Sequence, residues 1–140
     1  MKKVLFMCVA NSARSQMAEG IAKSIYLDFK IESAGSKPTK LNPIAVKVMN
    51  EIGIDISNNF SKDINSLNKK FIDELDYVIT LCKEEVCPII ITNAKKIHLP
   101  FLDPAIDNLP EKELIKNFRD IRNQIKKKII ELKTIFEVSF

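Results

Sequence analysis

Residues 4–15 read VLFMCVANSARS, and this stretch decides the fold. Its apolar part, residues 4–9, has no helical spacing and predicts a buried strand. After a polar turn, apolar side chains recur three or four positions apart, which predicts a helix over about residues 14–28. A strand that passes through a short turn into a helix is the basic unit of α/β proteins.

Outside this stretch, strand and helix signals continue to alternate. Runs of β-branched, aromatic or other apolar residues predict further strands at 30–34, 77–82 and 96–99. Helical signals predict a helix from the Asn42-Pro43 cap to Gly53, another at roughly 67–75, and a long one from 111 onward. We therefore expect a single α/β domain over residues 1–140, a three-layer fold with a four-stranded parallel sheet flanked by helices on both faces.

Composition narrows the functional class. The chain has 140 residues, of which 46% are apolar and 29% charged, which argues against disorder. A net charge of +4 is too small to indicate a nucleic-acid partner, but it suits a small anionic ligand. The longest apolar run, residues 4–10, is too short to span a membrane. Three cysteines, an odd number, indicate reactive thiols in the cytoplasm rather than a disulfide scaffold.

The turn after the first strand predicts an oxyanion site. Arg14 follows Cys8 by six positions, and a turn that enters a helix can direct several backbone N–H groups inward. Such donors and the guanidinium favour the thiolate of Cys8, Arg14 can hold two oxygens of a tetrahedral anion, and Ser15 can donate to the sulfur. The expected oxyanion-binding residues are Val9, Ala10, Asn11, Ser12, Ala13 and Arg14.

Two more reactive groups fall at the same edge of the predicted sheet. Cys82 ends the third strand and Asp103 lies just beyond the fourth, while Cys8 ends the first. Ligands of parallel sheets bind at the carboxyl ends of the strands. A carboxylic acid that faces the anion could protonate a departing oxygen, which is the role we assign to Asp103.

Each feature also has a structural explanation. Cys8 could be a small buried side chain with Arg14 on the surface, and Asp103 could be a turn residue before proline. Cys82 and Cys87 could be buried structural cysteines. A non-catalytic oxyanion-binding or redox-sensing module is then a third class of protein to consider. His98, the one histidine, lacks a partner at metal-ligand spacing, so we predict no metal site.

Residues 8–14, followed by Ser-Gln-Met-Ala-Glu-Gly at 15–20, resemble the low-molecular-weight protein tyrosine phosphatase superfamily. More narrowly they resemble its thioredoxin-coupled arsenate reductases. The similarity runs nearly end to end through the blocks Ser33-Ala34-Gly35, Asn42-Pro43, Asp55-Ile56-Ser57-Asn58, Val78-Ile79-Thr80-Leu81-Cys82, Cys87-Pro88 and Asp103-Pro104-Ala105.

This resemblance implies a three-cysteine relay that reduces arsenate to arsenite without a cofactor, in arsenic detoxification. Cys8 attacks arsenate, Cys82 releases arsenite by forming a disulfide with Cys8, and Cys87 transfers that disulfide to Cys82–Cys87 for reduction by thioredoxin. The residues themselves do not distinguish thioredoxin from glutaredoxin. The chemistry requires two electrons, and therefore a thiol pair, whereas a phosphatase needs one nucleophilic cysteine.

The resemblance also allows an alternative function, and this sequence departs from the family pattern at Lys62. The alternative is a phosphatase that hydrolyses aryl phosphates through a phosphocysteine on Cys8, although Ala105 stands where tyrosine phosphatases usually carry an aromatic residue. Lys62 stands where the best-known reductases carry an acidic ligand of a potassium ion. We interpret its ammonium as a replacement for that ion, in contact with Asn11 and Ser33, with a solvated surface lysine as the alternative.

Overall fold

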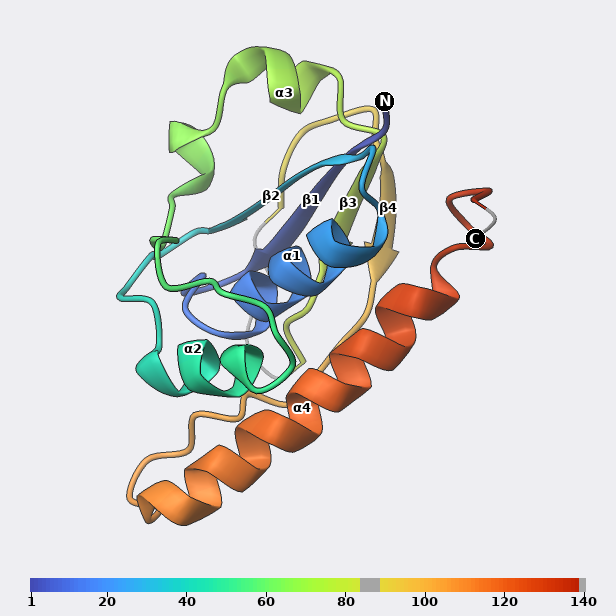
Figure 1. The fold of residues 1–140 in the computed structure, drawn as a ribbon. Coiled ribbons are helices and arrows are strands. Elements are labelled where there is room, and N and C mark those ends of the chain that lie inside the picture. Colours follow the sequence, from blue (N-terminus) through green and yellow to red (C-terminus); the bar gives the residue numbers. More distant parts are fainter. Residues whose placement is uncertain (84–88, 139–140) are drawn as a thin grey trace.

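The sheet has the strand order β2-β1-β3-β4, and every neighbouring pair is parallel. It is seen in a computed structural model that describes residues 1–83 and 89–138 (Figure 1). The described strands are β1 (Lys3–Cys8), β2 (Lys30–Gly35), β3 (Tyr77–Thr80) and β4 (Lys95–His98). The described helices are α1 (Arg14–Ile25), α2 (Pro43–Asn50), the 3-10 turn η1 (Ile64–Ser66), α3 (Lys69–Asp73) and α4 (Glu111–Glu131).

Helices cover both faces of the sheet, and the interior strand β1 is apolar on both of its faces. In β1, Val4 and Phe6 pack into the core formed with α1, α2 and α4, whereas Leu5 and Met7 pack into a second core with Phe71 of α3. Figure 1 shows α1, α2 and α4 together on one side, with α3 apart from them. Since successive side chains of a strand point to opposite faces, a continuous apolar run is what a doubly covered strand needs. The predicted four-stranded parallel α/β fold is confirmed.

Element boundaries differ from the sequence prediction where side chains cap the backbone. The helix predicted at roughly 67–75 is shorter in the structure, where α3 spans Lys69–Asp73, and the unpredicted turn η1 precedes it at Ile64–Ser66. The Asp63 carboxylate accepts from the N–H of Asn65 and caps η1, and the Asn68 side chain accepts from the N–H groups of Lys70 and Phe71 and caps α3. The two caps, five residues apart, account for the unpredicted turn η1 and for the start of α3 at Lys69. Asn42 caps α2 in the same way, as predicted.

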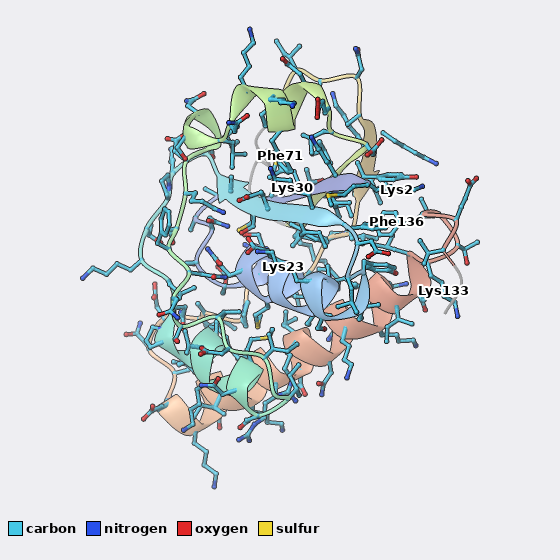
Figure 2. All side chains as sticks on the ribbon, turned by 45° about the horizontal axis from the view of Figure 1, so that its top comes forward. Lys2, Lys23, Lys30, Phe71, Lys133 and Phe136 are labelled. Carbon is cyan, nitrogen blue, oxygen red and sulfur yellow. The ribbon has the colours of Figure 1, made fainter. Side chains whose placement is uncertain are left out.

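Tyr26, just after α1, anchors the C-terminal segment to the core. Its ring lies 5.1 Å from those of Phe29 and Phe136, and its hydroxyl donates to the backbone oxygen of Ile129 at 2.6 Å. Figure 2 marks Phe136 at this end of the molecule. Burial raises the pKa of Tyr26 from 10.0 to about 12. Among the described helices, none has the length and apolar character to cross a membrane.

This burial predicts a contribution to alkaline unfolding. Because the folded pKa of Tyr26 is the higher one, the stabilisation is complete below pH 10.0 and declines as pH rises towards about 12. In Tyr26→Phe the free energy of unfolding at pH 8 should fall by about 1 kcal/mol for the lost hydrogen bond, with a smaller further loss between pH 10 and 12 than in the unmodified protein. Urea titrations at a series of pH values measure both. The control Tyr77→Phe removes an exposed hydroxyl, and an equal flattening there would contradict the assignment.

Candidate active site

Three of the predicted reactive residues, Cys8, Arg14 and Asp103, meet in a pocket at the carboxyl end of β1. The pocket measures about 240 Å³ and is lined by Cys8, Val9, Ala10, Ser12, Ala13, Arg14 and Asp103. Cys8 ends β1 and is 3% exposed, and Arg14 begins α1. The strand and the helix therefore hold the thiol and the guanidinium at the two ends of one short loop. The Asn11 side chain is the exception to the prediction, because it is bonded behind the loop rather than lining the pocket.

The carbonyl groups of this loop are held away from the pocket by the backbone. Segment 37–42 supplies three N–H donors: Lys37 to Val9 at 3.0 Å, Thr39 to Ala10 at 3.1 Å, and Asn42 to Ser12 at 2.9 Å. The Ala13 oxygen accepts from Met17 within the first turn of α1, at 2.8 Å. In a trans peptide the C=O and N–H groups point in opposite directions, and the described bonds include no cis peptide. The N–H groups that follow these carbonyls thus face the pocket, which makes an anion-binding nest.

Gly35 permits this close contact between the loop and β2. A Cβ atom built at Gly35 would lie 2.3 Å from the backbone oxygen of Val9, a distance that real Cβ atoms do not show. Gly35 also donates its N–H to the Lys62 oxygen at 2.9 Å. The sequence predicts a strand that stops at residue 34, just before Gly35, but it does not show that a side chain at Gly35 would clash with the loop.

Ser15 and Asn11 hold the sulfur of Cys8 from behind. The Ser15 hydroxyl oxygen lies 2.9 Å from Sγ of Cys8, and it accepts a hydrogen bond from Nδ2 of Asn11 at 2.8 Å. Since that bond uses an acceptor site of the hydroxyl, the hydroxyl hydrogen can be donated to an ionised sulfur. Asn11 has φ of 49°, in the left-handed region that asparagine tolerates better than most residues.

Arg14 and Asp103 face each other across the pocket. Nη1 of Arg14 donates to the backbone oxygen of Phe101 at 2.9 Å, and Nη2 lies 3.9 Å from Oδ2 of Asp103. Arg14 is 5% exposed, whereas the Asp103 side chain is 52% exposed. Oδ1 of Asp103 accepts from the N–H of Ala105, so the carboxylate is ordered but open to solvent. This places a fixed guanidinium inside the pocket and a carboxyl group at its mouth.

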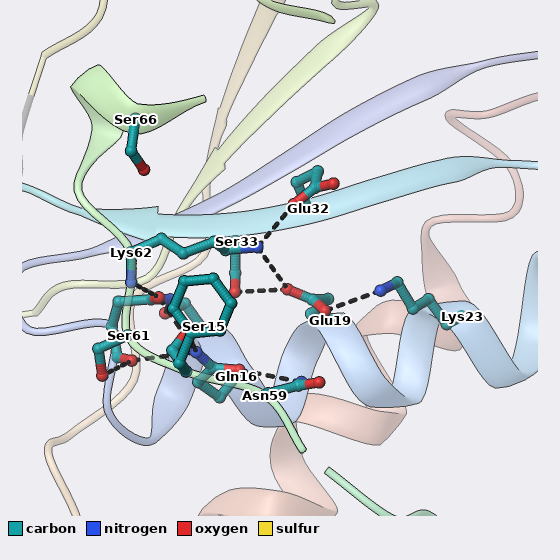
Figure 3. A network of polar contacts seen from close by, with 12 residues as sticks. Ser15, Gln16, Glu19, Lys23, Glu32, Ser33, Asn59, Ser61, Lys62 and Ser66 are labelled. Carbon is teal, nitrogen blue, oxygen red and sulfur yellow. Dashed lines mark hydrogen bonds and ion pairs between the residues drawn. The ribbon is translucent and has the colours of Figure 1, made fainter. Parts of the chain in front are cut away.

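Lys62 contacts carboxylates rather than the predicted Asn11 and Ser33 side chains (Figure 3). Its ammonium donates to Glu32 at 2.6 Å and lies 3.9 Å from Glu19, which in turn accepts from the Ser33 hydroxyl at 2.6 Å. Asn11 is reached by the backbone N–H of Lys62, at 2.8 Å. The prediction of direct ammonium contacts is therefore wrong, because an ammonium group prefers ionised carboxylates to a neutral amide or hydroxyl.

The other two predicted thiols, of Cys82 and Cys87, belong to a later part of the chain than the loop. Cys82 follows β3 and is 1% exposed; it is disulfide-bonded, whereas Cys8 is a free thiol. The Leu81 N–H still pairs with the Met7 oxygen, so the chain leaves the sheet beside the end of β1. Cys87 lies outside the described residues.

The one histidine, His98, does not line the pocket. Nδ1 of His98, at the end of β4, lies 2.7 Å from the hydroxyl oxygen of Thr80. Within residues 1–83 and 89–138, no group of three or more His, Cys, Asp or Glu side chains is arranged to hold a metal ion.

The fold and this pocket place the chain in a known family of α/β proteins. The family model described as low molecular weight phosphotyrosine protein phosphatase matches residues 3–137, and the chain belongs to this family. Among curated relatives, it is 42% identical over 135 residues to Arsenate reductase 1 of Staphylococcus haemolyticus (strain JCSC1435), covering 94% of this chain and 95% of that protein. It is 41% identical over 133 residues to the arsenate reductase of Bacillus subtilis (strain 168), covering 93% and 94%.

Solved structures similar to this chain also include arsenate reductases. An arsenate reductase in the phosphate binding state superimposes with a TM-score of 0.75 at 34% identity, covering 99% of this chain and 100% of that one. A thioredoxin-dependent arsenate reductase of Corynebacterium glutamicum superimposes with a TM-score of 0.60 at 30% identity, covering 92% of this chain and 62% of that longer one. The family predicted by resemblance is confirmed.

Proposed function

We propose that this protein reduces arsenate to arsenite through Cys8, Cys82 and Cys87, with thioredoxin as the electron donor. The observation that carries the proposal is the pocket itself, in which the free thiol of Cys8, the Arg14 guanidinium and inward-facing N–H groups surround a space suited to a tetrahedral oxyanion. The named relatives and the thioredoxin-dependent structural neighbour support the choice of arsenate and thioredoxin. Such thiol chemistry fits the reducing cytoplasm.

The first step is attack by Cys8 on arsenic. The nest and Arg14 hold the arsenate oxygens, and the Cys8 thiolate forms a sulfur–arsenic bond. One arsenic–oxygen bond breaks, and Asp103 at the pocket mouth donates a proton so that this oxygen leaves as water. Arsenic is still in its +5 state, since sulfur has replaced oxygen without electron transfer.

The second step transfers the electrons. The Cys82 thiolate attacks the sulfur of Cys8, a disulfide forms, and the electron pair of the sulfur–arsenic bond passes to arsenic, which leaves as arsenite. Cys87 then attacks Cys82, which frees Cys8 and leaves a Cys82–Cys87 disulfide for thioredoxin to reduce. The bonding states, a disulfide at Cys82 and a free thiol at Cys8, are those expected after this last exchange and support the proposal.

The test is arsenate-dependent consumption of NADPH with thioredoxin and thioredoxin reductase. The unmodified protein should turn over continuously, while Cys82→Ser and Cys87→Ser should each stop after at most one arsenite per protein. Glutaredoxin in place of thioredoxin tests the choice of donor. Sustained turnover by either variant, or no arsenate-dependent consumption by the unmodified protein, would contradict the relay.

A phosphatase reaction is the second candidate, because the same pocket fits phosphate. Cys8, Arg14 and Asp103 would then form and hydrolyse a phosphocysteine, with Cys82 and Cys87 unused. The relative solved in a phosphate binding state supports phosphate as a ligand. Cleavage of p-nitrophenyl phosphate that is unaffected by Cys82→Ser, in a protein that does not reduce arsenate, would favour this candidate.

We also propose that the Lys62 ammonium makes potassium unnecessary for the loop. Two ammonium groups, of Lys23 and Lys62, balance the carboxylates of Glu19 and Glu32, so this cluster does not fit a further cation. Potassium chloride should therefore change the reaction rate by less than about twofold relative to sodium chloride at equal ionic strength. In Lys62→Met, the carboxylate of the buried Glu19 loses a neighbouring positive charge, and the free energy of unfolding should fall by about 1–3 kcal/mol.

Lys62→Asp provides the reverse test. It restores the acidic residue that the resemblance implies for potassium-binding relatives, so potassium should now stimulate the reaction while sodium does not. A several-fold stimulation of the unmodified protein by potassium would contradict the proposed role of Lys62.

A further inference from the structure

In the loop of residues 9–13, which joins β1 to α1, one carbonyl group is held differently from the others. Those of Val9, Ala10 and Ser12 accept from backbone N–H groups of segment 37–42, whereas the Asn11 oxygen accepts from two side chains. Nε2 of Gln16 donates to it at 3.2 Å, and the Ser61 hydroxyl donates at 2.8 Å. The orientation of the peptide between Asn11 and Ser12, and so of the Ser12 N–H, depends on these side chains.

Gln16 is fixed in a single orientation by its other partners. It is fully buried in the first turn of α1, two positions after Arg14. Nε2 also lies 3.0 Å from both Oδ1 of Asn11 and the Phe60 oxygen, so its two hydrogens serve three acceptors and one of them is shared. The oxygen of Gln16 accepts from Asn59 at 3.1 Å. Figure 3 shows Gln16 between the loop and the segment that carries Asn59. An amide that uses both its donor and acceptor ends cannot flip without losing hydrogen bonds.

We propose that Gln16 is a positioning residue for the oxyanion site. By holding the Asn11 carbonyl outward it directs the Ser12 N–H into the pocket, and by holding Oδ1 of Asn11 it directs Nδ2 towards the Ser15 hydroxyl behind Cys8. The inference deepens the proposed function, on which its catalytic consequence rests. Its effect on anion binding does not depend on which reaction the site performs.

The local backbone explains why such a restraint is needed. Asn11 adopts φ of 49°, in the left-handed region, which is unfavourable for residues with a Cβ atom although less so for asparagine than for most. Without Gln16, a single hydroxyl would remain on the Asn11 oxygen, and the peptide could relax towards a less strained geometry. A glutamate at this position would place an acceptor oxygen against three other acceptors: the carbonyl and Oδ1 of Asn11, and the Phe60 oxygen.

Protection of Cys8 by inorganic phosphate measures the site directly. The reduced protein is alkylated with iodoacetamide at increasing phosphate concentrations, and peptide mass spectrometry follows Cys8 alone. Gln16→Met keeps the side-chain length but removes the donors, so we expect phosphate affinity to fall by about tenfold, the effect of one lost hydrogen bond. Asn59→Ala removes only the bond to the Gln16 oxygen. The contacts of the Gln16 NH₂ group with Asn11 and with the Phe60 oxygen remain and still hold the side chain, so the phosphate affinity should stay within about twofold of the unmodified protein.

Gln16→Glu adds a second measurement, the pH dependence of phosphate binding, which a general loss of structure would not change. Its deprotonated carboxylate should weaken phosphate binding at pH 8 at least as much as methionine does, whereas the protonated acid can donate one bond. The deficit relative to the unmodified protein should therefore shrink at pH 5.5. Equal losses in Gln16→Met and Asn59→Ala, no loss in Gln16→Met, or a deficit of Gln16→Glu that is independent of pH would each overturn the proposal.

These outcomes are separable from those of the proposed function. If the unmodified protein binds phosphate but reduces no arsenate, the relay fails while the role of Gln16 can still be measured. If arsenate is reduced and Gln16→Met binds phosphate normally, the relay stands and the positioning role is wrong.

Discussion

Replacing Cys8 by serine is expected to abolish arsenate reduction, lowering turnover by at least about 10⁴-fold. A serine hydroxyl is a far weaker nucleophile than a thiolate, and an oxygen–arsenic adduct cannot be resolved by a second cysteine into a disulfide. The substitution changes one atom in a side chain that is 3% exposed, so the fold should be retained. The measurement is the rate of arsenate-dependent NADPH consumption with the thioredoxin system.

Ligand binding separates loss of chemistry from loss of the site. The inward N–H groups and Arg14 do not depend on the sulfur, so Cys8→Ser should still bind inorganic phosphate, measured by calorimetry. Residual turnover within about tenfold of the unmodified protein would show that Cys8 is not the nucleophile. Loss of phosphate binding together with activity would show instead that the substitution had damaged the loop.

Replacing Arg14 by lysine is expected to lower kcat/KM for arsenate by about 10²–10³-fold. The guanidinium donates to the Phe101 oxygen through Nη1 while Nη2 faces the pocket, 3.9 Å from Asp103. A planar fork can keep one nitrogen on that carbonyl and offer others to the oxyanion. An ammonium group is a single point of charge and cannot do both with the same geometry. Steady-state kinetics with arsenate as the varied substrate measure the effect.

Arg119→Lys is the matched control. Arg119 lies on α4, where it pairs with Glu51, and neither residue lines the pocket of Cys8, so its replacement should change kcat/KM by less than about twofold. Thermal unfolding of both variants shows whether stability was altered. If Arg14→Lys retained more than about a third of the kcat/KM of the unmodified protein, charge alone would suffice and the bidentate role would be wrong.

Much of the fold could be predicted because its signals are local. The apolar run at the start of the chain predicted a strand covered on both faces, which β1 is. Asn42-Pro43 predicted the start of α2, since a capping side chain and a proline at the first turn act within a few residues. Boundaries were less predictable. The start of α3 at Lys69 and the extra turn η1 before it depend on which of several polar side chains caps the backbone, and periodicity carries no information about that choice.

The sequence by itself determined the strand–loop–helix unit, the family, and the placement of a thiol and a guanidinium at the two ends of one loop. Only the tertiary structure decided what holds that loop: backbone donors from segment 37–42, the fit of Gly35 against Val9, and the side chains of Gln16 and Ser61. It also placed the Lys62 ammonium on Glu32 instead of Asn11. These contacts join parts of the chain that local patterns treat independently, and their geometry is set by how the strands and helices pack.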